Sequence, residues 1–229
     1  MKRSSRRDDA GDATSAGSPA GASARREYDR RRAQREDHAR ARFPRIGGLL
    51  LALNEEPTST RVWDQGAKGE EAVGAVLDGI ADVLVLHDRR LNGGSRANID
   101  HLVVAASGVW VVDTKTHKGD LEVRRLGGVF RPREDRLLIN GRDRTSLIEG
   151  LQRQVETVQR ALITAQLDVP VHGALCFVGT TLPWTDKAID GIPLIGRRGL
   201  RKAVQRRGDL DAAARASVAA LLDSRFPPA

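Results

Sequence analysis

The sequence predicts a mixed α/β domain, and two patterns support that fold class. Apolar residues recur at helical spacing in two segments, Val73 to Ile80 and Leu147 to Leu162. Two runs rich in β-branched residues, Asn98 to Val104 and Val109 to Lys115, flank the turn signal Ser107-Gly108 and predict an antiparallel hairpin. Helical segments on either side of strands are typical of a sheet covered by helices.

Composition separates a charged N-terminal tail from one domain within the 229 residues. Residues 1–24 are rich in Ser, Gly, Ala, Asp and Arg, and cannot bury enough apolar surface to offset chain entropy, so we expect disorder there. Residues 25–42 mix Arg with Asp and Glu without an apolar stripe, which favours a solvated, partial helix. We therefore expect a disordered or partly helical tail over residues 1–60 and a domain over residues 61–229.

Charge and composition limit the classes of partner. The net charge of +8 and the isoelectric point of about 10.4 favour a polyanion such as nucleic acid. Only 3% of residues are aromatic, which argues against a stacking platform for single strands. The single cysteine, Cys176, excludes an internal disulfide, and its apolar surroundings predict a buried side chain. The apolar stretch over residues 46–53 is too short to span a membrane, and no apolar segment follows Arg6-Arg7, so we expect a cytoplasmic protein without a membrane partner.

Shorter elements complete the expected fold. Apolar runs bounded by Gly, Pro or polar residues predict strands at residues 83–86, 121–123, 137–139, 171–178 and 192–195. Helical spacing predicts helices at residues 70–80, 146–166 and 210–222, with a basic, partly helical segment at 197–207. Residues 87–96 and 124–136 are rich in Arg and Gly, and we expect loops there. Within the first loop, Arg89, Arg90 and Arg96 are either ordinary surface charge or contacts to a phosphate backbone.

Acidic and basic residues gather at the open end of the predicted hairpin. Side chains at i and i+2 of a strand share a face, so Asp113 and Lys115 project together. Asp100 lies distal to the turn on the neighbouring strand and can converge on that pair. Two carboxylates suit Mg²⁺ or Mn²⁺, and an ammonium can orient or help deprotonate water, or offset charge on a phosphate. The cluster indicates metal-assisted phosphodiester hydrolysis, with a solvated surface ion pair as the alternative.

Two further polar residues lie on apolar helix faces. Glu70 shares the face of Val73, where a carboxylate needs a cation or a hydrogen-bond donor. The helix dipole also favours an acidic residue in a first turn, which is the alternative explanation for Glu70. Gln154 falls on the apolar stripe between Leu151 and Val158. A substrate, a metal-bound water or a backbone carbonyl would satisfy its amide.

This order of elements and residues resembles the nuclease-related domain family, NERD, which is itself similar to the PD-(D/E)xK restriction-endonuclease-like superfamily. The residues that carry the resemblance are Gly66-Ala67-Lys68-Gly69-Glu70, Asn98-Ile99-Asp100-His101, Gly108 to Lys115, and Gln154. The resemblance spans residues 63–162. It implies a restriction-endonuclease-like mixed β-sheet flanked by helices, and a Mg²⁺-dependent nuclease acting on DNA, with RNA as a second possible substrate.

The resemblance also implies roles for individual residues. Asp100 and Asp113 would be metal ligands and Lys115 the catalytic lysine. Glu70 would be an auxiliary ligand or a water-orienting group, and Gln154 a supporting residue of the site. Position 99 is Ile where the superfamily name has Pro, and position 113 is Asp where many relatives have Glu. Asp keeps the ligand type, so the second departure changes little.

Two other functions remain open at this level. A nucleic-acid-binding module would keep the fold without turnover, and a signalling or scaffold protein would use Asp113 and Lys115 as a structural ion pair. Divalent-metal binding that disappears in Asp100→Ala distinguishes the enzyme from the binding module, whereas in a scaffold protein apolar replacement of both Asp113 and Lys115 would leave stability nearly unchanged. His101 faces the opposite side of its strand from Asp100, so we expect it to pack or to support the site from behind.

Overall fold

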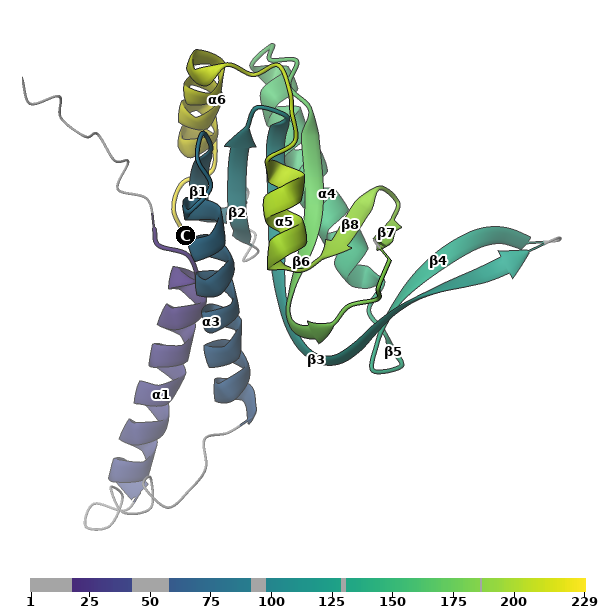
Figure 1. The fold of residues 1–229 in the computed structure, drawn as a ribbon. Helices are drawn as coiled ribbons and strands as arrows, with labels where there is room; N and C mark the ends of the chain where they lie inside the picture. The colour runs from purple at the N-terminus through teal and green to yellow at the C-terminus, as the bar shows by residue number, and fades with distance from the viewer. Residues whose placement is uncertain (1–17, 43–57, 92–97, 129–130, 186) are drawn as a thin grey trace, which may run out of the picture.

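The computed structural model describes residues 18–42, 58–91, 98–128, 131–185 and 187–229. Eight strands in these ranges form one mixed sheet in the order β1-β2-β3-β6-β8-β7, with β4 paired to β3 and β5 to β4. Helices flank the sheet (Figure 1), so the predicted α/β class is confirmed. The expectations for residues 1–17 and for the apolar stretch 46–53 lie outside the described residues. No helix in the described ranges is long and apolar enough to cross a membrane.

The elements in chain order are α1 (Ala22–Arg42), α3 (Thr58–Asp78), β1 (Leu84–Arg90), β2 (Asn98–Ala105), β3 (Gly108–Gly128), β4 (Arg131–Ile139), β5 (Arg142–Asp143), α4 (Ser146–Thr164), β6 (Val171–Thr181), β7 (Lys187–Ile189), β8 (Ile192–Ile195), α5 (Arg197–Val204) and α6 (Ala212–Arg225).

The hairpin of β2 and β3 lies at the centre of the sheet, as predicted. Ala105 pairs with Gly108 at the turn, and His101 pairs with Val112 farther out. Gly108 has φ 123°, and a Cβ there would lie 2.4 Å from the Pro170 carbonyl oxygen, so this turn requires glycine. On its other side β3 runs parallel to β6. A parallel pair needs a long crossover, which here contains the β3–β4 ribbon and α4.

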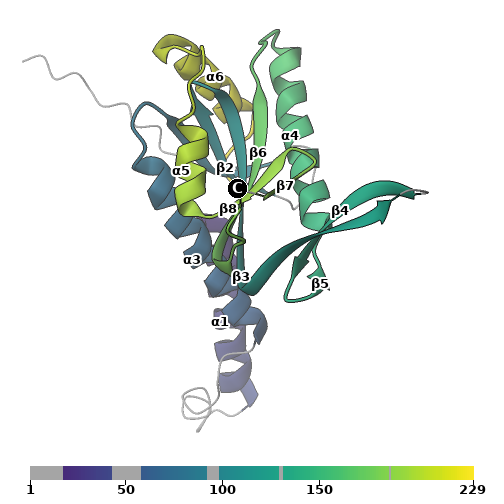
Figure 2. The same cartoon turned by 45° about the vertical axis from the view of Figure 1, so that its right-hand side comes forward.

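Helices cover both faces of the sheet (Figures 1 and 2). α3 and α5 pack on one face, while α4 and α6 pack on the other. On the α3 face the buried side chains include Val73, Leu77, Val103, Trp110, Val112, Cys176 and Leu200. On the α4 face they include Leu102, Val111, Leu151, Val158, Leu175, Val218 and Leu222. Both predicted amphipathic helices therefore bury the apolar stripes from which they were predicted, and Cys176 is buried as expected.

Parts of both expected basic loops are instead strands, whereas residues 92–96, which include Arg96, lie outside the described residues. β1 continues to Arg90, because Arg89 and Arg90 pair with β2 at Ile99 and Asn98. Arg89 is fully buried and contacts Asp223 of α6. Both expectations for this residue, ordinary surface charge and a contact to a phosphate backbone, are therefore wrong. Burial by helices far away in sequence overrides the polar composition here.

Residues 124–128 and 131–136 form a two-stranded ribbon rather than an irregular connection. β3 continues to Gly128 and returns as β4, with Arg125 opposite Asp135. The ribbon projects from the body of the molecule in both views (Figures 1 and 2). Cross-strand ion pairs such as Arg125–Asp135, at 2.8 Å, replace apolar contacts along it. Apolar alternation was therefore a poor guide to these strands.

Helix α1 docks on the domain through its first turn. The Ser23 N–H and hydroxyl donate to the Asp88 carboxylate at 2.6 and 2.7 Å. Arg25 pairs with Asp64 and Glu71 of α3 at 3.0 and 2.8 Å. Because α1 is highly charged and has no apolar stripe, hydrogen bonds and ion pairs attach it to the domain.

Candidate active site

The hairpin brings Asp100, Asp113 and Lys115 together. The Lys115 ammonium donates to the Asp113 carboxylate at 2.5 Å. The Thr114 backbone N–H donates to one oxygen of Asp100 at 2.8 Å, which ties the Asp100 carboxylate to β3. The His101–Val112 pair lies just inside, so Asp100 and Asp113 occupy the next level of the hairpin. The convergence expected from strand geometry is therefore present.

Burial and mutual repulsion perturb the acidic groups of this cluster. Burial, followed by the charges of Asp113 and Glu70, raises the pKa of Asp100 well above its usual range. Burial, followed by the charges of Asp88 and Asp113, raises the pKa of Glu70 to about 7, although Lys115 acts in the opposite direction. Three carboxyl groups thus share a poorly hydrated region with one ammonium.

The same surroundings act on Lys115. Burial lowers its pKa, but the charges of Asp113, Asp100 and Glu70 outweigh burial and leave the pKa above its ordinary value. Lys115 is therefore protonated at neutral pH. The raised pKa values of Asp100 and Glu70 reflect burial and mutual repulsion of the carboxylates, and a further cation would relieve that repulsion.

Glu70 reaches the cluster because α3 approaches β3 very closely. A Cβ on the neighbouring Gly69 would lie 2.1 Å from the Thr116 hydroxyl oxygen, so glycine permits this approach. The helix begins at Thr58, twelve residues earlier, so Glu70 is not in a first turn. The dipole explanation for this glutamate is therefore wrong, and its surroundings in the cluster remain the explanation.

Gln154 lies partly buried on α4 with half of its amide unsatisfied. Its Nε2 donates to the Asn98 backbone carbonyl at 3.5 Å. Its Oε1 is buried and has no hydrogen-bond partner. A buried amide oxygen without a donor is costly, so this atom calls for a water or a ligand that supplies one.

The donors present fit a hard divalent cation with few protein ligands. No group of three His, Cys, Asp or Glu side chains stands in metal-binding geometry among the described residues. Mg²⁺ needs no such group, since it is usually held by one or two carboxylates together with waters and substrate phosphate. Asp100 and Asp113 supply two carboxylates of that kind, and the unsatisfied Gln154 oxygen can accept from a coordinated water.

Sequence reasoning missed two residues that support the cluster. The buried Asp88 carboxylate accepts a hydrogen bond from the Asn98 side-chain amide at 3.2 Å, and the Asn98 backbone carbonyl accepts one from the Gln154 amide. Asp88 and Asn98 therefore help to position Gln154. No sequence pattern indicates Asp88, whose partners are distant in the chain. His117 lies two residues beyond Lys115 on β3, but the pairing of β3 with β6 is irregular between Thr116 and Gly119, so strand spacing does not fix the face of His117.

His101 packs behind the cluster, as expected. It is fully buried, and its ring contacts His87 and the Thr114 hydroxyl.

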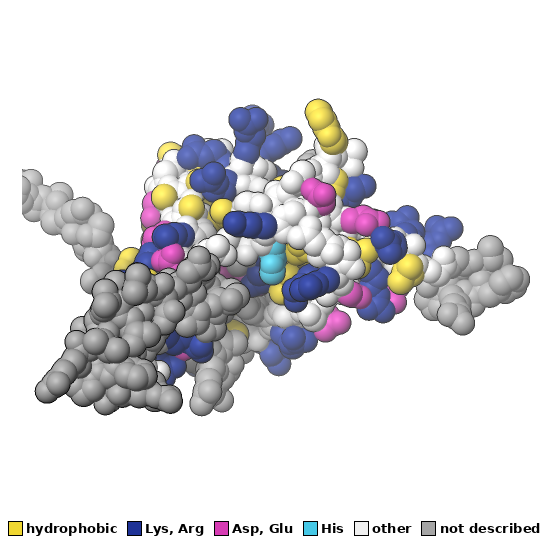
Figure 3. All heavy atoms as spheres, turned by 90° about the horizontal axis from the view of Figure 1, so that it is seen from below, with side chains coloured by type: hydrophobic (Ala, Val, Ile, Leu, Met, Phe, Trp, Pro, Cys, Tyr) yellow, Lys and Arg dark blue, Asp and Glu magenta, His cyan; other side chains and the backbone are white. Residues whose placement is uncertain are grey.

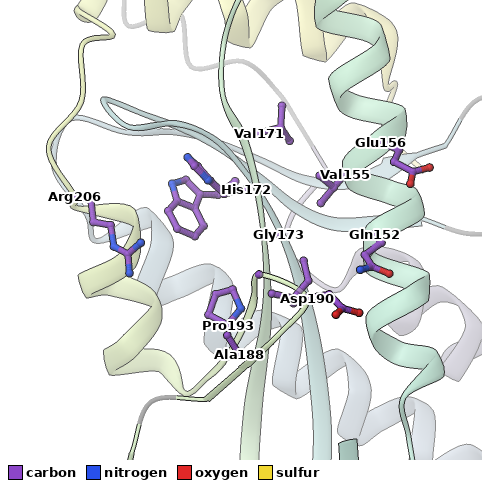
Figure 4. Close-up of a pocket in the computed structure, with 13 residues that line it drawn as sticks. Gln152, Val155, Glu156, Val171, His172, Gly173, Ala188, Asp190, Pro193 and Arg206 are labelled. Atoms are coloured by element: carbon purple, nitrogen blue, oxygen red, sulfur yellow. The ribbon is translucent and has the colours of Figure 1, made fainter. Parts of the chain in front are cut away.

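An open pocket of about 640 Å³ lies elsewhere, between α4, β6 and the β7–β8 turn (Figure 4). Its lining includes Trp110, His172 and Arg206 but none of the five predicted site residues. The acidic cluster therefore lies outside this pocket.

Comparison with known families agrees with this geometry. Residues 65–178 match the family described as the nuclease-related domain, NERD. No curated protein and no solved structure matches the chain. The matched segment runs from α3 to β6 and includes all five predicted site residues. Through residues 65–178, the chain therefore belongs to the nuclease-related domain family.

Proposed function

We propose that this protein is a divalent-metal-dependent nuclease that hydrolyses phosphodiester bonds in DNA or RNA. The observation that carries the proposal is the meeting of Asp100, Asp113 and Lys115, all partly or fully buried, within a nuclease-related domain. The basic net charge of +8 supports a polyanionic substrate.

Asp100 and Asp113 would hold Mg²⁺ or Mn²⁺, with Glu70 as an auxiliary ligand. When bound, such an ion supplies positive charge that polarises a phosphoryl oxygen and favours attack by water. The raised pKa of Asp100 supports this role, because carboxylates that repel one another gain most from a shared cation.

The remaining residues act on the phosphate and on the attacking water. Lys115 is protonated, so it serves as a fixed positive charge and hydrogen-bond donor toward the phosphate, not as a base. The Gln154 Oε1 has a free acceptor site that would orient a water or a substrate hydroxyl. With its pKa at about 7, Glu70 is suited to exchange a proton near neutral pH when it is not a ligand.

A non-catalytic nucleic-acid-binding module is the second candidate function. One observation favours it: Lys115 is already paired with Asp113. A binding module would keep affinity for nucleic acid after loss of the acidic cluster.

Cleavage of labelled plasmid and oligonucleotides by the full chain tests the proposal. The reactions contain Mg²⁺, Mn²⁺ or EDTA, and compare wild type with Lys115→Met, Asp100→Asn and the control Lys187→Met, which changes a lysine on β7 outside the matched segment. We expect metal-dependent cleavage that falls about 100-fold or more in the two site variants and is unchanged in the control. Absent cleavage, or equal cleavage by all four proteins, would contradict the enzyme. Nucleic-acid binding that persists without cleavage in wild type would instead support the binding module.

A further inference from the structure

The open pocket of about 640 Å³ lies along a stretch of β6 that, among the described residues, has a partner strand on one side only. Residues 171–173 pair with β3, whereas β8 pairs with β6 only at Leu175 and Cys176. Figure 4 shows this stretch of β6 between α4 and the segment that carries Arg206. The pocket therefore lies beside a strand edge that β8 leaves open.

Backbone hydrogen-bonding groups of Val171 and Gly173 face the pocket. The Val109 N–H donates to the Pro170 carbonyl at 2.9 Å, so the Pro170 carbonyl is directed toward β3. The N–H and C=O groups of successive residues alternate sides along a strand, so those of Val171 and Gly173 point away from β3, toward the pocket that both residues line. The Val171 carbonyl and the Gly173 N–H therefore present an acceptor and a donor to the pocket.

Pro193 explains why β8 leaves this edge open. Leu194 is opposite Leu175, so continued pairing would bring the N–H of residue 193 to the Gly173 carbonyl. Proline has no N–H, and the pairing ends there. Gly173 is buried, and buried backbone groups without a partner are costly. This edge therefore calls for a ligand or a water that forms hydrogen bonds with it.

Two stacked rings form one wall of the pocket. The ring centroids of Trp110 and His172 lie 4.6 Å apart, with an interplanar angle of 35°. Ser107 holds both rings, because its hydroxyl accepts from Trp110 Nε1 at 3.1 Å and its carbonyl accepts from His172 Nε2 at 3.1 Å. Trp110 is only 2% exposed, so His172 presents the accessible ring. A fixed aromatic ring of this kind suits stacking against a planar ligand.

Arg206 supplies a positive charge beside these rings. Its guanidinium carbon lies 5.9 Å from the centre of the Trp110 ring, and it forms no ion pair with a carboxylate in the described part of the chain. Basic charge alone does not distinguish Arg206, since Figure 3 shows Lys and Arg side chains spread across one face of the molecule. Its location in the pocket lining does. Glu156 and Asp190 lie across β6 from it (Figure 4), so an anionic group belongs on the side of Arg206.

We propose that this pocket binds a nucleotide whose base carries an amino donor beside a ring acceptor, as adenine does. The amino group donates to the Val171 carbonyl and the ring nitrogen accepts from the Gly173 N–H, while the base stacks on His172. The phosphate contacts Arg206. The open edge comprises residues 171–173, whereas strands usually have about five or six residues, so a compact ligand fits better than an added peptide strand.

This site is separate from the proposed nuclease centre, because its lining contains none of the five predicted site residues. A free mononucleotide and an unpaired base of a nucleic-acid strand present the same groups to it. The test therefore includes both sources of ligand.

Calorimetric titration of the full chain in EDTA with adenosine monophosphate (AMP), adenosine and inosine monophosphate tests the pocket without cleavage. Wild type is compared with Arg206→Gln and with the control Arg207→Gln, which changes the next exposed arginine, outside the pocket lining. We expect Arg206→Gln to bind AMP about tenfold more weakly and adenosine as wild type does, because only the phosphate contact is lost. Inosine monophosphate should bind wild type about tenfold more weakly than AMP does, because a carbonyl replaces the amino donor. The control should bind all three as wild type does.

A second variant, Ala188→Phe, places a ring in the mouth of the pocket at an exposed position of β7. It should abolish AMP binding while the midpoint of thermal unfolding stays near the wild-type value. Displacement of bound AMP by single-stranded oligo(dA) would support the site and assign it to an unpaired base, whereas AMP binding without displacement would support it and assign it to a free nucleotide. No saturable AMP binding by wild type, or equal AMP binding by wild type, Arg206→Gln and Ala188→Phe, would overturn the site.

Discussion

His101 lies in a chain of polar groups that runs from the surface to β3. Its Nδ1 lies 2.8 Å from the Nδ1 of His87, and its Nε2 lies 3.3 Å from the Thr114 hydroxyl. The Nε2 of His87 lies 2.9 Å from the Asp78 carboxylate. Since two Nδ1 atoms face each other, one ring must donate and the other accept. With neutral rings, His87 donates to Asp78, His101 donates to His87, and Thr114 donates to His101.

Acid should destabilise the fold through His101. Burial, together with the charge of His87, lowers the pKa of His101 to about 3. Between pH 3 and the unfolded value near 6.5, the unfolded chain binds more protons, so the contribution of this residue to stability falls as pH falls, by at most about 1.4 kcal/mol per pH unit. Glu70 acts in the opposite direction, because its raised pKa makes the folded state bind more protons between pH 4.5 and 7.

The contribution of His101 is therefore measured as the difference in pH-dependent stability between wild type and a variant that lacks this histidine. Urea unfolding of wild type and His101→Gln at several values between pH 5 and 7.5 should give a steeper loss of stability toward acid in the wild type. Parallel pH profiles for the two proteins would contradict the assignment.

Arg89 and Asp223 form an ion pair in which the arginine is buried and the aspartate is exposed to solvent. The guanidinium of Arg89 is fully buried and contacts Asp223, whose side chain is 45% exposed, at 2.5 Å. Removing the acid leaves a buried charge without its partner, so we expect Asp223→Ala to lower the free energy of unfolding by about 1–2 kcal/mol. Arg89→Met with Asp223→Ala should recover part of that loss, because an apolar side chain suits the buried position. Urea denaturation measures both, and a neutral Asp223→Ala would contradict the account.

Local patterns predicted the three hairpin residues well and their surroundings poorly. Strand alternation alone places Asp113 and Lys115 on one face and brings Asp100 to them. The buried role of Asp88 depends on Ser23 and Asn98, which meet it only in the folded chain. Contacts between such distant positions leave no periodic signal in the sequence.

At the scale of elements, α1 illustrates docking without an apolar face. Its first turn donates hydrogen bonds from Ser23 to the Asp88 carboxylate, and a negative charge suits the positive end of a helix. Small residues allow close packing: a Cβ on Gly21 would lie 2.8 Å from the Ala67 carbonyl oxygen, and one on Gly74 would lie 2.5 Å from the Ala20 Cβ. The charged composition predicts a solvated helix, but not the glycine contacts and the single carboxylate that hold its start.

Loss of the Ser23 hydroxyl should loosen α1. In Ser23→Ala the Asp88 carboxylate keeps the backbone donor but loses the hydroxyl donor at 2.7 Å. We expect a loss of about 1 kcal/mol in the free energy of unfolding and faster tryptic cleavage within α1. Ser217→Ala is the matched control, since that hydroxyl only contacts its own helix. Equal stability of the two variants would argue against specific docking.

Strands with apolar runs were predictable, whereas strands stabilised by charge pairs were not. β6 and β8 have continuous apolar cores and were found at nearly their observed positions. The outer part of β1 and most of β4 consist of polar residues whose strand state depends on pairing and on helices packed from elsewhere.

At the scale of the whole molecule, the acidic cluster needs both helical layers. Glu70 comes from α3 on one face of the sheet, and Gln154 comes from α4 on the other. The hairpin supplies Asp100 and Asp113 between them. The candidate site therefore depends on the complete fold. The chain between Asp113 and Gln154 includes the β3–β4 ribbon, and the part of the ribbon beyond Lys115 contributes no predicted site residue.

Mn²⁺ binding by the full chain, followed by electron paramagnetic resonance, tests the central claim most directly. The comparison includes wild type, Asp100→Asn and the control Asp190→Asn, which changes an exposed acid in the β7–β8 turn. We predict saturable binding that weakens about tenfold or more in Asp100→Asn and is unchanged in Asp190→Asn. Absence of saturable binding, or equal binding by all three proteins, would contradict a metal centre at the carboxylates.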